Sequence, residues 1–104
     1  MLIEVLYVPG CPNHLSTVVR LREVLRSEGM DAGISEIAVT DEMAARDLRF
    51  RGSPTVRING MDVEPSREQS FGLACRLYSS GGGMPSQELL QRAVLIAKNQ
   101  EGDV

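Results

Sequence analysis

The hydrophobic pattern at the start of the chain predicts a buried strand followed by an amphipathic helix. Residues 2–8 are almost continuously apolar, with Glu4 as the only charged side chain, which is typical of a strand buried on both faces. Apolar residues then recur every three or four positions over residues 12–29, which predicts a helix with one hydrophobic face. Pro12 suits the first turn of that helix, and Gly29 suits its end.

The middle of the chain continues the alternation of strand and helix. Residues 32–39 have the apolar spacing of a second strand, and residues 41–48 predict a short helix with Thr40 as its N-cap. Residues 55–58 and 61–63 predict two more strands. Together these segments make an ordered β-α-β-α-β-β arrangement.

A hairpin and a final helix complete the pattern. Asn59 and Gly60 favour a two-residue type I′ turn, so the strands on either side of them should run antiparallel. Residues 73–78 predict a further short strand. The last helix is predicted over residues 85–98, with Ser86 as its N-cap because a serine hydroxyl accepts a hydrogen bond from the first helical turn.

This order of elements, β-α-β-α-β-β-α, predicts an α/β fold. A strand–helix–strand unit is right-handed and has parallel strands, and the hairpin adds an antiparallel pair. We therefore expect a mixed sheet of about four strands with helices on both faces. Residues 1–99 are predicted to form a single domain, and residues 100–104 a flexible C-terminal tail.

Composition and charge exclude several classes of protein. The chain has 104 residues, of which 42% are hydrophobic and 24% charged, with a net charge of −3. A folded core is therefore expected, and binding to nucleic acid through a basic surface is not. The first residues lack the basic segment of a signal peptide, and no stretch has the roughly 20 apolar residues of a membrane span. We expect a cytoplasmic protein without a membrane partner.

Cys11 is the first candidate for chemistry because it lies between the first predicted strand and the first predicted helix. The unpaired N–H groups and the positive dipole at a helix start favour the thiolate, which is the reactive form of cysteine. The chain has one other cysteine, Cys75. Two cysteines in a reducing compartment indicate free thiols and not a structural disulfide.

Two motifs resemble the thioredoxin-like superfamily, and within it the glutaredoxin-like branch. Cys11-Pro12-Asn13-His14 resembles the Cys-Pro-Tyr-Cys active site, and residues 53–60 resemble the segment in which a cis-proline opens a strand and an Asn-Gly turn follows. The resemblance covers most of residues 2–63 and the final helix, while residues 64–83 depart from it. Small bacterial thioredoxin-fold proteins of ill-defined function have the same appearance.

The resemblance implies a nucleophilic thiol at Cys11 and substrate contacts at Pro12, Ser53, Pro54 and Thr55. It further implies a cis peptide bond before Pro54. The backbone of Ser53 would then be free to pair with an extended peptide or a thiol tripeptide as a short added strand.

His14 and Cys75 leave alternatives open. His14 stands where two-cysteine enzymes carry their resolving thiol, and an imidazole cannot replace that thiol. It is expected to hydrogen-bond or protonate sulfur, to bind a soft metal, or to be a surface residue without a role. Cys75 is either a resolving thiol close to Cys11 or a buried core cysteine.

The leading function is that of a thiol–disulfide oxidoreductase or thiol-redox protein that uses Cys11, with a protein or small thiol or disulfide as substrate. One alternative is a soft-metal or mercurial binder using Cys11 with His14 and Cys75. A further alternative is a non-catalytic interaction module. No cofactor or resident metal is expected, and the chain is either a monomer or a homodimer.

Overall fold

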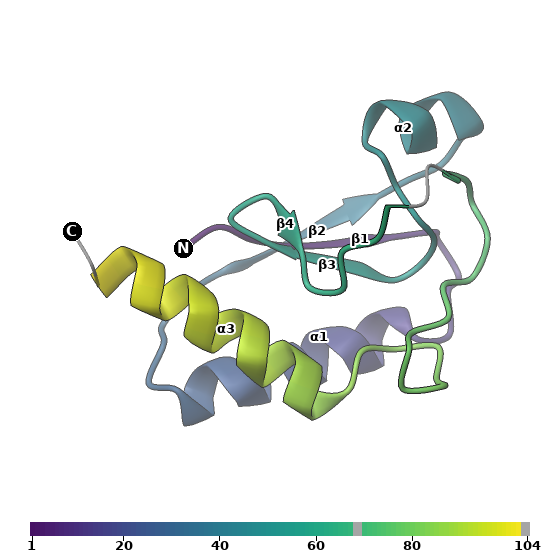
Figure 1. Cartoon of the computed structure of the whole chain (residues 1–104). Coiled ribbons are helices and arrows are strands. Elements are labelled where there is room, and N and C mark those ends of the chain that lie inside the picture. Colours follow the sequence, from purple (N-terminus) through teal and green to yellow (C-terminus); the bar gives the residue numbers. More distant parts are fainter. Residues whose placement is uncertain (68–69, 103–104) are drawn as a thin grey trace.

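The computed structural model describes residues 1–67 and 70–102 (Figure 1). Its elements follow the predicted order β-α-β-α-β-β-α. Their bounds are β1 (Ile3–Tyr7), α1 (His14–Ser27), β2 (Ile34–Ala38), α2 (Glu42–Asp47), β3 (Thr55–Ile58), β4 (Met61–Asp62) and α3 (Gln87–Gly102). Within the described part of the chain, no helix is both long and apolar enough to cross a membrane.

The strands form one mixed sheet of four strands in the order β2-β1-β3-β4. Strands β1 and β2 run parallel, whereas β3 runs antiparallel to both β1 and β4. Asn59 and Gly60 have positive φ angles of 53° and 80°, as a type I′ turn requires. The predicted α/β class, the mixed sheet and the hairpin are therefore confirmed.

Alternation along β1 assigns the helices to opposite faces of the sheet (Figure 1). Ile3 and Val5 belong to the main core, which includes buried residues of α1 and α3. Leu6 points the other way and packs in a smaller cluster with Ala45 of α2 and with Phe50. Because side chains alternate across a strand, one short strand joins both cores and places its carboxyl end between α1 and α2.

Helix ends differ from the sequence prediction in places. Asp41, and not Thr40, is the N-cap of α2, because its carboxylate accepts a hydrogen bond from the amide of Ala44 at 2.7 Å. Ser86 is confirmed as the residue that caps α3, since its hydroxyl accepts from the amide of Leu89 at 3.1 Å. Helix α3 continues to Gly102, so residues 100–102 are helical where a tail was predicted; residues 103–104 lie outside the described residues.

Residues 73–78 do not form the predicted strand. This segment makes one isolated parallel bridge, between Cys75 and Ser53, and is otherwise irregular. The apolar spacing of residues 73–78 favours a strand, but this segment pairs only with Ser53, which lies just before β3. The next residues turn back, with the amides of Gly81 and Tyr78 donating to the carbonyls of Tyr78 and Gly82 at 2.8 and 2.9 Å.

Candidate functional site

Cys11 lies in a tight loop between β1 and α1 and is partly exposed. Its amide donates to the carbonyl of Val8 at 3.0 Å, and its carbonyl accepts from the amide of His14 at 3.3 Å. Gly10 has a φ of +86°, which glycine adopts without a steric penalty and which lets the loop fold back. The thiol therefore lies just before the first turn of α1, as the sequence predicted.

Val8 connects the Cys11 loop to Ser53. The amide of Val8 donates to the hydroxyl oxygen of Ser53 at 3.0 Å, while its carbonyl accepts from Cys11. The peptide bond between Ser53 and Pro54 is cis, which confirms the expectation drawn from the resemblance. The two motifs that are far apart in the sequence are thus neighbours, joined by two hydrogen bonds through one residue.

The His14 side chain is held by two neighbouring strands. Its Nε2 atom lies 2.7 Å from a carboxylate oxygen of Glu36 in β2. The ring stacks on Tyr7 at the end of β1, with centroids 3.6 Å apart and ring planes 7° apart. Among the described residues, no hydrogen bond joins the ring to the sulfur of Cys11. Sequence reasoning missed Glu36, because its approach depends on the register of β2 against β1.

Cys75 is exposed, so the interpretation of this residue as a buried core cysteine is wrong. It lies in the irregular segment beside Ser53 and not in either hydrophobic core. No group of three or more His, Cys, Asp or Glu side chains is positioned to share a metal ion in residues 1–67 and 70–102. Cys11, His14 and Cys75 consequently do not form the three-ligand site of the metal-binding alternative.

The backbone of Ser53 is not free, contrary to the expectation for a peptide-binding edge. Its amide donates to the carbonyl of Ala74, and its carbonyl accepts from the amide of Arg76, both at 3.0 Å. Ser53, Pro54 and Thr55 are all buried, while Pro12 is exposed. Of the four residues predicted to contact substrate, Pro12 is therefore the one that solvent reaches.

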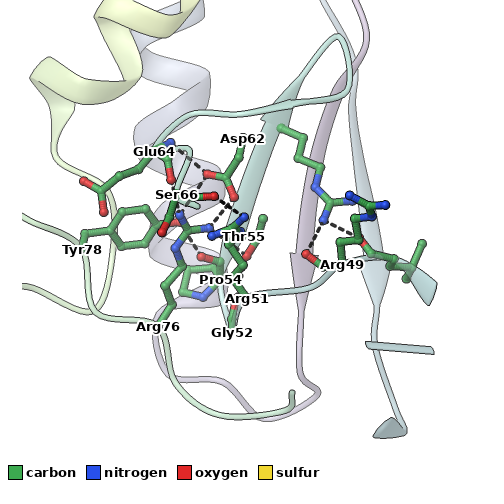
Figure 2. A network of polar contacts seen from close by, with 12 residues as sticks. Arg49, Arg51, Gly52, Pro54, Thr55, Asp62, Glu64, Ser66, Arg76 and Tyr78 are labelled. Atoms are coloured by element: carbon green, nitrogen blue, oxygen red, sulfur yellow. Dashed lines mark hydrogen bonds and ion pairs between the residues drawn. The ribbon is translucent and has the colours of Figure 1, made fainter. Parts of the chain in front are cut away.

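Arg76 forms the centre of a buried polar network (Figure 2). Its guanidinium donates to both carboxylate oxygens of Asp62, at 2.7 and 3.0 Å, to the hydroxyl of Thr55 at 3.1 Å and to the carbonyl of Glu64 at 2.8 Å. Burial lowers the pKa of Arg76, but the bond to Asp62 and the surrounding negative charge outweigh it, so the pKa lies above its ordinary value. No sequence pattern predicted this network, because a lone arginine in a short segment normally indicates a solvated surface.

Tyr78 joins the same network from the far end of the segment (Figure 2). Its hydroxyl donates to the carbonyl of Pro54 at 2.6 Å, and its ring lies 4.6 Å from the guanidinium carbon of Arg76. Burial raises the pKa of the Tyr78 phenol well above its ordinary value, although the charge of Arg76 opposes the rise. The phenol is therefore a neutral donor that fixes the segment against Pro54.

The raised pKa of Tyr78 predicts a loss of stability in alkaline solution. The unfolded phenol ionises near pH 10 and the folded one at higher pH, so the stabilisation is complete below pH 10 and is lost as the pH rises above it. Between the pKa of the unfolded phenol and that of the folded phenol, the free energy of unfolding should fall by up to about 1.4 kcal/mol per pH unit. Urea unfolding from pH 9 to 11 measures this slope. In Tyr78→Phe, unfolding should release one proton fewer in this pH range, so the free energy of unfolding should fall less steeply with pH. Identical slopes in both proteins would contradict the assignment.

The comparisons with known proteins returned no match. No protein-family model, no curated protein and no solved structure is similar enough to this chain to be reported.

Proposed function

We propose that this protein is a thioredoxin-like thiol–disulfide exchange protein in which Cys11 is the nucleophile. The observation that carries the proposal is the partly exposed Cys11 thiol in the β1–α1 loop, tied through Val8 to Ser53 beside Pro54. This is the arrangement that the resemblance implies for a reactive thiol. The sheet order, with β1 between β2 and β3, agrees with it because it brings the ends of β1 and the start of β3 together.

The proposed chemistry has two exchange steps. The Cys11 thiolate attacks one sulfur of a disulfide, forms a mixed disulfide with that half and releases the other half as a thiolate. A second thiol then attacks the mixed disulfide, and Cys11 leaves as a thiolate. Because His14 replaces a resolving cysteine in the motif, that second thiol must come from elsewhere: from a free low-molecular-weight thiol or from Cys75.

The surroundings of His14 suit proton transfer, and no group of three metal-ligating side chains among the described residues includes it. Its Nε2 is occupied by Glu36, and the stack on Tyr7 holds the ring in one orientation at the first residue of α1. The ring's other nitrogen, Nδ1, has no hydrogen bond to another described residue. We propose that it exchanges a proton with the attacking or leaving thiol, which lies one helical turn away in the sequence.

The proposal predicts that Cys11 reacts with a small aromatic disulfide faster than an ordinary thiol does. In the Cys75→Ser background, the reaction with 5,5′-dithiobis(2-nitrobenzoate) at pH 7 should be about tenfold faster than that of free glutathione, because the positive end of the α1 dipole attracts the anionic reagent and the negative charge that the exchange carries. Release of thionitrobenzoate in a stopped-flow spectrometer measures the rate.

Two controls make this test specific. The Cys11→Ser variant, which keeps Cys75, should react at a rate close to that of glutathione, since an exposed thiol away from a helix start has no such assistance. Circular dichroism checks that both variants are folded. If Cys11 and Cys75 react at the same rate as glutathione, Cys11 is not an activated nucleophile and the proposed function is wrong.

A further inference from the structure

We infer that Cys11 exchanges with compact low-molecular-weight disulfides and not with extended polypeptides, because residues 73–78 permanently occupy the backbone edge at Ser53. This inference rests on the proposed function and specifies its substrate class. An extended chain is recognised by strand addition only where an N–H and a C=O group are both unpaired. At Ser53 both groups already pair with Ala74 and Arg76, at 3.0 Å each.

Residues 73–78 are held in place by more than these two backbone hydrogen bonds. Arg76 is only 6% exposed, and its side chain makes four hydrogen bonds to three residues of the β3–β4 region: Thr55, Asp62 and Glu64. On the other side, the Tyr78 hydroxyl holds the carbonyl of Pro54. Figure 2 shows the Arg76 side chain pointing toward Asp62 and Thr55, with Tyr78 beside it.

Packing beneath the segment is equally close. A Cβ atom placed on Gly52 would lie 3.0 Å from the carbonyl oxygen of Ala74 and 3.1 Å from the amide nitrogen of Arg76. The segment therefore rests directly on the backbone that precedes Ser53. Contact at this distance leaves no space into which a second extended chain can enter between the two.

An incoming polypeptide cannot replace what it would displace. It would restore two backbone hydrogen bonds at Ser53, but it would leave the Asp62 carboxylate without its buried cationic partner. Removing one member of a buried charge pair is strongly unfavourable, whereas exchanging one backbone bond for another is nearly neutral. Displacement of residues 73–78 by a peptide would therefore cost free energy, and the peptide is excluded.

The chain that follows residues 73–78 also lies against the Cys11 loop. A Cβ on Gly83 would come within 2.5 Å of the side-chain nitrogen of Asn13, so the chain at Gly83 packs directly against the motif. Cys11 nevertheless remains partly exposed, and its neighbour Pro12 is exposed. A small disulfide needs only this partial exposure of Cys11 and no backbone pairing.

The test compares two disulfides that share one leaving group. Both are mixed disulfides of thionitrobenzoate, one with 2-mercaptoethanol and one with the cysteine of an unstructured nine-residue peptide. In the Cys75→Ser protein, the rate with each is divided by the rate of free glutathione with the same disulfide. We expect the peptide to have no advantage, so that the normalised peptide rate is equal to or below the normalised rate of the small disulfide.

An open edge would give a different result. Two backbone hydrogen bonds to Ser53 would raise the normalised peptide rate by about tenfold or more over that of the small disulfide, and that outcome overturns the inference while leaving the proposed function intact. If neither disulfide reacts faster than it does with glutathione, the proposed function fails and the inference fails with it.

Hydrogen exchange in the same protein gives a second measurement that needs no variant of the network. The amides of Ser53 and Arg76 should stay protected when the peptide, with its cysteine replaced by serine, is present at millimolar concentration. Faster exchange of the Arg76 amide on adding the peptide would show that the segment is displaced, and would overturn the inference.

Discussion

Arg76→Met should lower the free energy of unfolding by about 3 kcal/mol, the largest effect expected for a single side chain outside the hydrophobic cores. Methionine keeps most of the length and the contact with Tyr78 but removes the charge. Asp62, whose side chain is 13% exposed, then remains a partly buried carboxylate without a cationic partner. It retains one bond, from the amide of Glu64 at 2.8 Å, which places the expected loss at the low end for a broken buried pair.

Urea unfolding followed by circular dichroism measures this change. The midpoint should fall while the m-value stays constant, because the surface exposed on unfolding is unchanged. Arg22→Met is the matched control: Arg22 is an exposed residue of α1, and its replacement should change stability by no more than about 0.5 kcal/mol.

The double variant of Arg76 and Asp62 distinguishes loss of the ion pair from a general loss of packing around residue 76. Adding Asp62→Asn to Arg76→Met removes the unpaired charge and should recover part of the lost stability, because an amide is easier to bury than a carboxylate. If the second change lowers stability further by its full single-variant amount, the two side chains do not interact as the structure indicates.

The parts of the fold that could be predicted from the sequence are those that depend on local residue patterns. The apolar run before Cys11, the helical spacing after it and the turn at Asn59 and Gly60 each depend on residues within a few positions of one another. The order of these elements then limits the sheet to few arrangements. For the same reason the position of the Cys11 thiol, between a strand and a helix start, was predicted correctly.

The contacts around the site could not be predicted, because they join segments that are distant in the chain. Glu36 reaches His14 only because β2 pairs with β1 in a particular register, with Val5 opposite Glu36. For Cys75 the residue type favoured a core position over a resolving role, and its exposure follows from how residues 73–78 lie on Ser53.

Arg76 shows the same limit most clearly. Arginine is rarely buried unless it is paired, and its partners in this protein come from the β3–β4 hairpin and from the loop that follows it. No pattern within residues 73–78 marks that residue as buried. The departure from the thioredoxin-like pattern over residues 64–83 is therefore where sequence reasoning was least informative, and it is also where the structure closes the expected peptide-binding edge.

Gly52→Ala should destabilise the protein by about 3 kcal/mol, through two separate effects. Gly52 has a φ of +122°, a conformation in which an L-residue with a Cβ is strained. The new methyl group would also approach the backbone of Ala74 and Arg76 to 3.0–3.1 Å, where the neighbours are not flexible side-chain ends. Chemical denaturation measures the total loss.

Two other glycines separate these effects. Gly60 also has a positive φ, of 80°, but open space surrounds its Cβ position, so Gly60→Ala reports backbone strain alone, with an expected loss of about 1 kcal/mol. Gly33 has open space and no positive φ, and Gly33→Ala should be within about 0.5 kcal/mol of the wild type. Gly52→Ala should therefore cost more than Gly60→Ala for two reasons: its φ lies further from the left-handed helical region, and the new methyl group meets the backbone of residues 74–76. If Gly52→Ala costs no more than Gly60→Ala, the close approach of Ala74 and Arg76 to residue 52 does not resist the added methyl group.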